Sequence, residues 1–262
     1  MLLVILAPLA LAGLAFAVPS NRHRPLVLLA GALVHAAGVA ALLAAPPAAA
    51  AGAWLALDAL GKVTLGTTTV LFVATAVYAQ GYLRRRADRD NRVLVGGLLV
   101  ALAAMTTVAL SHHLGLSWVA IELTTLTTAP IIYFNRSARS LEAAWKYLLI
   151  SSLGIALALL GTFFLALSGA GPGGPRSLLV EDLVAAGQTL SGPWVRAAFV
   201  FLLVGYGTKM GLAPLHSWNT RTIATKAKLV TPPASSAPRS PGASPYASGF
   251  QECSGASPIF VP

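Results

Sequence analysis

Residues 93–111 read VLVGGLLVALAAMTTVALS, a run of nineteen residues without one charged side chain. At 1.5 Å per residue, a helix of about 20 residues crosses the roughly 30 Å hydrocarbon core of a bilayer. Similar apolar runs follow one another along most of the chain. The sequence therefore predicts an all-α, polytopic transmembrane helix bundle with about seven spans, near 1–18, 25–45, 63–83, 93–111, 114–134, 143–168 and 196–216.

The overall composition excludes several other classes of protein. Of the 262 residues, 56% are hydrophobic and only 10% are charged, whereas soluble domains carry roughly 25% charged residues. The net charge of +10 comes from basic residues in short loops between apolar runs, so it indicates orientation in a bilayer and no nucleic acid partner. The single cysteine, Cys253, has no partner for an internal disulfide, and no CxxC pair is present. We therefore expect no metal and no redox cofactor.

The basic loops alternate along the chain. They follow the first, third and fifth spans, and the loops after the second and fourth spans carry little positive charge. The positive-inside rule then places the N-terminus outside and predicts a multi-pass protein of the cell (inner) membrane. The run Arg84–Arg86 is most simply explained by topology and contact with anionic lipid.

Glu122 lies near the middle of an apolar run, about eight residues from each end, hence near mid-depth of the bilayer. Placing an acidic side chain there costs roughly 2.5 to 3.5 kcal/mol, and such residues are kept for ion pathways and proton relays. The alternative is a structural carboxyl that only hydrogen-bonds a neighbouring helix. The position favours a proton relay.

Lys209 is a second charge inside a predicted span. Gly205, Gly207, Gly211 and Pro214 surround it, and such residues interrupt membrane helices and free backbone groups to hold a charge at depth. Close packing through small residues would explain the glycines but not the lysine. Glu122 and Lys209 are therefore the main candidate residues for proton translocation.

Three further residues are candidates for an auxiliary relay. Glu142 and Lys146 are spaced i, i+4 on one helix face and form either a surface pair or a polarising pair that feeds the buried site. His216 follows Pro214 at the end of the seventh span, where it would pass protons near neutral pH or cap the interface.

The chain changes character after residue 218. Residues 219–262 are rich in Pro, Ser and Ala and contain no apolar run of spanning length. This composition predicts a disordered tail, so we divide the chain into a transmembrane region, residues 1–218, and this tail.

Three segments resemble the proton-translocating membrane subunits shared by NADH:quinone oxidoreductase, Mrp-type antiporters and membrane-bound hydrogenases. They read Trp118-Val-Ala-Ile-Glu-Leu-Thr-Thr-Leu126, Ser140-Leu-Glu-Ala-Ala-Trp-Lys-Tyr-Leu148 and Gly205-Tyr-Gly-Thr-Lys-Met-Gly-Leu-Ala-Pro-Leu-His-Ser-Trp218. The first two look most like the hydrogenase-4 and formate hydrogenlyase branch. The resemblance covers roughly residues 1–218.

The resemblance implies a mechanism and partners. In that family the glutamate matching Glu122 and the lysine matching Lys209 act as a coupled pair, so movement of Glu122 relative to Lys209 would change how tightly the lysine holds its proton. We expect Lys209→Ala to reduce coupling while membrane insertion stays intact. The partners implied are the other membrane subunits and the hydrophilic subunits of a redox-driven complex, and this chain would be a non-redox subunit without a catalytic centre.

The resemblance ends at Trp218. Family members are bundles of about fourteen helices built from two inverted repeats, and this chain covers a truncated N-terminal part. We hypothesise a frameshift near codon 219, which the coding DNA would test. The alternatives to a subunit of a redox-driven complex are a stand-alone cation/proton antiporter component and a non-functional fragment.

Overall fold

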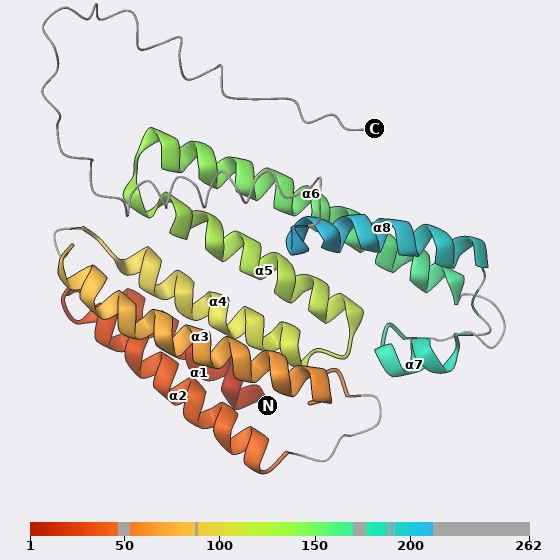
Figure 1. Cartoon of the computed structure of the whole chain (residues 1–262), viewed down its shortest axis with the longest axis horizontal. Helices are drawn as coiled ribbons and strands as arrows, with labels where there is room; N and C mark the ends of the chain where they lie inside the picture. Colours follow the sequence, from red (N-terminus) through yellow and green to blue (C-terminus); the bar gives the residue numbers. More distant parts are fainter. Residues whose placement is uncertain (47–52, 87–88, 170–176, 188–189, 191, 212–262) are drawn as a thin grey trace, which may run out of the picture. The chain divides into compact units, whose positions relative to one another are not determined.

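The computed structural model describes residues 1–46, 53–86, 89–169, 177–187, 190 and 192–211. Every regular element in these ranges is helical (Figure 1). The elements are α1 Leu2–Ala17, α2 Arg24–Ala44, α3 Ala59–Arg84, α4 Arg92–Leu110, α5 Leu114–Ile132, the 3₁₀ helix η1 Tyr133–Asn135, α6 Ala138–Ser168, α7 Val180–Ala185 and α8 Gly192–Met210. The chain is thus helical throughout its described part, as the sequence predicts.

Several helices begin at residues that satisfy free backbone N–H groups. Asp58 precedes α3 and accepts a hydrogen bond from Gly61 N at 2.6 Å. Ser137 and Ser140 form a reciprocal capping box at the start of α6. These caps replace partners that the first turn of a helix lacks, so they fix where each helix starts.

Five helices are long and apolar enough to cross a membrane: α2, α3, α4, α5 together with η1, and α6. The apolar helix α1 has 16 residues and is shorter than a usual span. The nineteen-residue helix α8 is not among the five. Each of the seven predicted ranges overlaps one of α1–α6 or α8, although 212–216 lie outside the described residues. The number of spans, about seven, stays a prediction.

The helices pack as neighbours within residues 1–220. Helix α4 contacts α1, α2, α3 and α5, and α6 contacts α5 and α8 (Figure 1). Small and branched apolar residues of α1–α4 form one core, and residues nearer the other helix ends form a second. The first core consists of Ala12, Ala15, Leu28, Ala32, Ala76, Ala79, Leu83, Val95 and Leu99.

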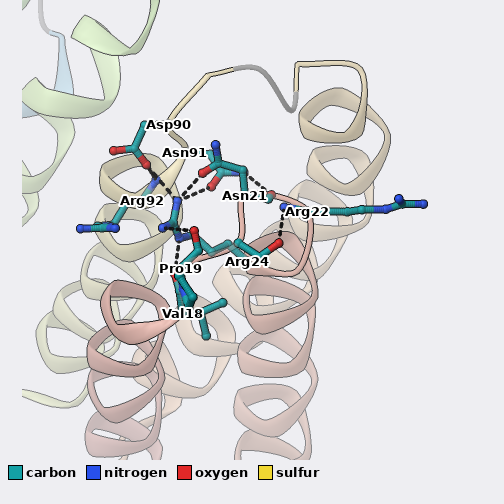
Figure 2. Close-up of polar contacts among 9 residues, drawn as sticks. Val18, Pro19, Asn21, Arg22, Arg24, Asp90, Asn91 and Arg92 are labelled. Atoms are coloured by element: carbon teal, nitrogen blue, oxygen red, sulfur yellow. Dashed lines mark hydrogen bonds and ion pairs between the residues drawn. The ribbon is translucent and has the colours of Figure 1, made fainter.

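A buried arginine joins two loops at one end of these helices (Figure 2). Arg24, at the start of α2, is only 1% exposed. Its Nη1 lies 2.9 Å from Asp90 Oδ1 and 3.3 Å from Asn91 Oδ1, in the loop before α4. Its guanidinium also donates to acceptors of the α1–α2 loop, namely Val18 O at 2.8 Å, Pro19 O at 3.1 Å and Asn21 Oδ1. We call Asn21, Arg24, Asp90 and Asn91 the Arg24 cluster.

The loops between helices gather at two opposite ends. Next to the Arg24 cluster, Arg86 Nη1 donates to Asn135 Oδ1 at 3.0 Å, which joins the α3–α4 loop to η1. The other loops are joined by backbone hydrogen bonds, each 2.9 Å long, from Ala56 N to Leu110 O, from His112 N to Trp54 O and from Val180 N to His112 O. The basic loops therefore share one end. Which end faces the cytoplasm stays a prediction.

Helices α2, α3 and α4 share one buried polar contact. His35 is 1% exposed, and its Nε2 lies 2.9 Å from Thr106 Oγ1. Its Nδ1 lies 3.5 Å from Thr69 Oγ1. His35 is thus a packing residue that ties three helices together.

The contacts divide the chain into Met1–Thr220 and Arg221–Pro262. The second unit lies outside the described residues. The predictions of a disordered tail and of a frameshift fall there and in the residues just before it, so they stay predictions.

Candidate functional site

Glu122 lies on α5 and faces α6. Its Oε1 accepts a hydrogen bond from Ser152 Oγ at 2.9 Å. Its Oε2 is buried and has no hydrogen-bond partner among the described residues. One turn before it, Trp118 Nε1 donates to Ile155 O at 2.8 Å, which fixes α5 against α6. Because a buried carboxylate oxygen without a partner is costly, Glu122 is an under-satisfied group held in place by its neighbours.

Lys209 reaches the same interface from α8. Its Nζ lies 3.5 Å from Thr124 Oγ1 on α5 and 3.4 Å from Tyr147 OH on α6. It also lies 5.6 Å from the centre of the Tyr147 ring, within the range of a cation–π contact. Both hydrogen bonds are long, because N–H···O distances are typically about 2.9 Å. The ammonium group is therefore held loosely.

Glu122 and Lys209 do not form a direct ion pair, since no Nζ to carboxylate distance is within 4.0 Å. Both residues nevertheless contact the interface of α5 and α6, Glu122 through Ser152 and Lys209 through Thr124 and Tyr147. Thr124, Tyr147 and Ser152 thus lie beside the two charges. We call Glu122, Thr124, Tyr147, Ser152 and Lys209 the Glu122–Lys209 cluster.

The two hydroxyl groups that face Lys209 differ in their remaining contacts. Thr124 Oγ1 donates to Ile121 O at 2.6 Å, so its proton is taken and it faces the lysine as an acceptor. The side chains of Thr128 and Ser151 lie within hydrogen-bonding reach of the Tyr147 hydroxyl. A phenolic hydroxyl both donates and accepts, so Tyr147 has partners on two sides.

Glycines bring α8 against α6 and so position Lys209. A Cβ on Gly205 would lie 2.6 Å from Ala158 N and 2.7 Å from Gly154 O. A Cβ on Gly154 would lie 1.9 Å from Thr208 Oγ1. Since main-chain atoms cannot move aside cheaply, only glycine fits at Gly205 without a shift of the helices. Lys209 follows one turn later on the same helix.

Helix α8 ends at Met210, one residue after Lys209. The next residue, Gly211, has φ 69°, which lies in the left-handed region that favours glycine. Lys209 therefore lies in the last turn, where unpaired carbonyl groups favour a cation. The predicted interruption by Gly205 and Gly207 is not found, because α8 is continuous through both. The absent Cβ of Gly205 serves packing instead. Pro214 and His216 lie outside the described residues.

Glu142 and Lys146 form an i, i+4 ion pair near the start of α6. Their side chains are 57% and 46% exposed, and Lys146 Nζ lies 5.9 Å from the centre of the Trp145 ring. No hydrogen bond or ion pair joins this pair to Glu122 or Lys209. The geometry is that of a surface pair, and the auxiliary relay role stays a prediction.

Three members of the cluster were not singled out from sequence: Thr124, Tyr147 and Ser152. Tyr147 follows Lys146 directly, and neighbouring residues of a helix point about 100° apart. That offset does not decide which neighbour of Lys146 faces the interior, because Trp145 on its other side is 49% exposed. Thr124 and Ser152 carry no sequence signal either. No group of residues suited to hold a metal ion occurs within the described ranges.

Comparisons with known proteins indicate the family. Residues 111–228 match the family model described as NADH:quinone oxidoreductase/Mrp antiporter, TM. The Hydrogenase-4 component F homolog of Methylacidiphilum infernorum is 34% identical over 181 residues, covering 64% of this chain and 37% of that protein. NADH-quinone oxidoreductase subunit N of Desulforudis audaxviator is 31% identical over 169 residues, covering 64% and 32%.

A comparison with solved structures indicates the same family. A chain of respiratory complex I from Thermus thermophilus, solved with bound Aureothin, superposes with a TM-score of 0.65 at 25% identity, covering 82% of this chain and 45% of that one. The chain belongs to the family of antiporter-like membrane subunits. It is a multi-pass membrane protein and spans about a third of the length of the curated relatives it matches.

Proposed function

We propose that this chain is part of a proton-translocating membrane subunit of a redox-driven complex. The observation that carries the proposal is the Glu122–Lys209 cluster. Two charges from α5 and α8, separated widely in sequence, lie at one interface in which Glu122 Oε2 has no partner and Lys209 has only long contacts. Charges inside membrane helices are costly and are kept mainly for ion pathways.

The contacts support a division of roles. A protonated Lys209 donates to Thr124 Oγ1 and Tyr147 OH, and an ionised Glu122 stabilises that charge. When Glu122 moves away or takes up a proton, this support falls and Lys209 releases its proton more readily. Tyr147 can accept a proton on one side and donate on the other, whereas the Thr124 hydroxyl is committed to Ile121 O. Tyr147 is the relay group and Thr124 a positioning residue.

The partners follow from the relatives. The complex would contain other membrane subunits and hydrophilic iron–sulfur subunits of a hydrogenase or NADH dehydrogenase-like assembly, in the cell (inner) membrane. Co-purification of the full-length protein with iron–sulfur subunits tests this assignment. Sodium-driven proton movement by the isolated protein, without any redox donor, would favour the stand-alone antiporter instead.

The proton pathway is tested on the purified full-length protein in liposomes that contain a pH-sensitive dye. A potassium gradient with valinomycin drives proton entry. We expect Glu122→Gln and Lys209→Ala to lower the rate at least about tenfold, as is typical for loss of a proton-transfer group. Tyr147→Phe should also lower the rate of proton entry, because it removes the hydroxyl that relays the proton and leaves the packing of the ring unchanged.

The matched controls are Glu181→Gln and Lys62→Ala, which remove the same charges from exposed positions on α7 and α3. Both should transport protons at the rate of the unchanged protein. An unchanged rate in Glu122→Gln, with normal insertion, would contradict the proposed function.

A further inference from the structure

A cavity of about 370 Å³ opens at the end of the helices that carries the basic loops. Its walls come from the α3–α4 loop and from η1 with the residue that follows it, so two basic loops meet there. The lining residues are Arg89, Asp90, Phe134, Asn135 and Arg136. We call this cavity the arginine pocket. It shares no residue with the Glu122–Lys209 cluster and has no part in the proposed proton pathway.

The arginine pocket carries a net positive charge. Asp90 is the only carboxylate in its lining, and Asp90 Oδ1 already accepts hydrogen bonds from Arg24 Nη1 at 2.9 Å and Arg92 N at 3.0 Å. The backbone N–H of Arg92, followed by the surrounding guanidinium groups, holds the pKa of Asp90 below its usual range. Asp90 is therefore ionised at neutral pH, and the buried Arg24 offsets its charge. The charges of Arg89 and Arg136 have no ion-pair partner among the residues that the structure describes.

Arg136 has an unusual backbone conformation. With φ 48° and ψ 34°, it is the only residue other than glycine with positive φ in the described part of the chain. A side chain with a Cβ is disfavoured there, and strained positions of this kind cluster at functional sites. The bend, closed by a hydrogen bond of 2.8 Å from Arg136 N to Tyr133 O, brings the arginine to the wall of the pocket.

The lining also defines the chemistry of a ligand. Guanidinium groups match phosphate oxygens through paired, charge-assisted hydrogen bonds. Phe134 adds an apolar wall, and its ring lies 6.5 Å from that of Tyr82 at the end of α3. The ends of apolar helices lie at the depth of lipid headgroups, where basic residues attract anionic lipid. We propose that the arginine pocket binds the phosphate group of an anionic phospholipid. Free phosphate has the same chemistry but does not use the apolar wall.

The test is native mass spectrometry of the purified full-length protein with equal amounts of phosphatidylglycerol and phosphatidylcholine. The variant Arg89→Gln/Arg136→Gln removes both unpaired charges. Arg136→Gly removes one charge at a position where glycine is relaxed, so its stability should equal or exceed that of the unchanged protein. Arg22→Gln is the matched control, because Arg22 is an exposed arginine of the same basic end that does not line the pocket. A parallel arm adds inorganic phosphate without phosphatidylglycerol.

We expect the unchanged protein and Arg22→Gln to retain phosphatidylglycerol over phosphatidylcholine. The double variant should bind it about tenfold more weakly, since two charge-assisted contacts are lost, and Arg136→Gly should fall between. Protection from heat by inorganic phosphate alone, lost in the double variant, would support the same site and identify free phosphate as its ligand. Equal binding of phosphatidylglycerol by the double variant and the unchanged protein, or an equal loss in Arg22→Gln, would overturn the proposal.

Discussion

The Arg24 cluster and the Glu122–Lys209 cluster both place charges among apolar helices, yet their contacts differ. Arg24 is 1% exposed and donates to five acceptors, including the ionised Asp90. In the other cluster, Glu122 Oε2 has no partner and Lys209 has two long hydrogen bonds. A fully satisfied charge holds loops in one arrangement. An under-satisfied pair costs less to rearrange, which a group that exchanges protons requires.

The largest effect should come from the satisfied cluster. Replacing Arg24 by Met leaves Asp90 and several buried acceptors without their donor, so we expect a loss of about 3 kcal/mol of stability. The measurement is thermal unfolding in detergent, compared with Arg22→Met, which removes an exposed arginine two residues earlier and should change stability by less than about 0.5 kcal/mol. An equal loss of stability in both variants would show that the hydrogen bonds of Arg24 do not stabilise the fold.

The next effect concerns the packing that positions Lys209. Gly205→Ala introduces a Cβ 2.6 Å from Ala158 N, and overpacking of this kind costs about 1 to 3 kcal/mol. We also expect slower proton movement, because α8 must shift away from α6. The matched control is Gly66→Ala on α3, where a Cβ meets nothing within 4 Å. If Gly205→Ala is as stable and active as Gly66→Ala, the close packing of α6 and α8 is not required.

The protonation of Asp90 makes the stability of the Arg24 cluster depend on pH. Its pKa in the folded protein is lowered from the ordinary value of 3.8, so its contribution to stability is complete above that value and is lost as the pH falls through the lowered pKa. Because its side chain is 47% exposed, we expect at most about 1 kcal/mol. Unfolding of the unchanged protein and Asp90→Asn between pH 7 and pH 2 measures this. The two should differ at pH 7 and converge in acid, and a constant difference would be contrary to the assignment.

The smallest effect should come from the exposed pair on α6. Lys146→Met removes an i, i+4 partner of Glu142, and such pairs contribute about 0.3 to 0.5 kcal/mol. We expect a change of that size in thermal unfolding, reduced further in high salt. A loss of several kcal/mol would mean that the pair has buried partners in the assembled complex.

The fold and the two main charges could be predicted from the sequence because both signals are local. A run such as 93–111 indicates a membrane helix by itself, and a charge inside such a run is conspicuous. Glu122 and Lys209 needed no knowledge of their neighbours. The caps at Asp58 and at Ser137–Ser140 were not singled out, and they lie before the apolar runs predicted to begin near residues 63 and 143.

The partners of these residues could not be predicted, since they depend on tertiary contacts. Arg24 appeared in sequence as one basic loop residue among many, and its ion pair with Asp90 joins positions 66 residues apart. Ser152 looked like an ordinary small polar residue of a span, until α5 and α6 brought it to Glu122. The glycines of α8 suggested a broken helix. In fact Gly205 and Gly207 lie in a continuous one, because close approach of a neighbouring helix selects glycine as strongly as a break does.

The most direct test of the Glu122–Lys209 assignment is a double-mutant cycle on proton transport. Proton entry into liposomes is measured for the full-length protein, for Glu122→Gln, for Lys209→Ala and for the double variant. Residues that act as one unit give strongly non-additive effects, so the double variant should be no slower than the slower single variant. If the double variant instead shows the product of the two single reductions, the two residues act independently and the coupled pair is contradicted.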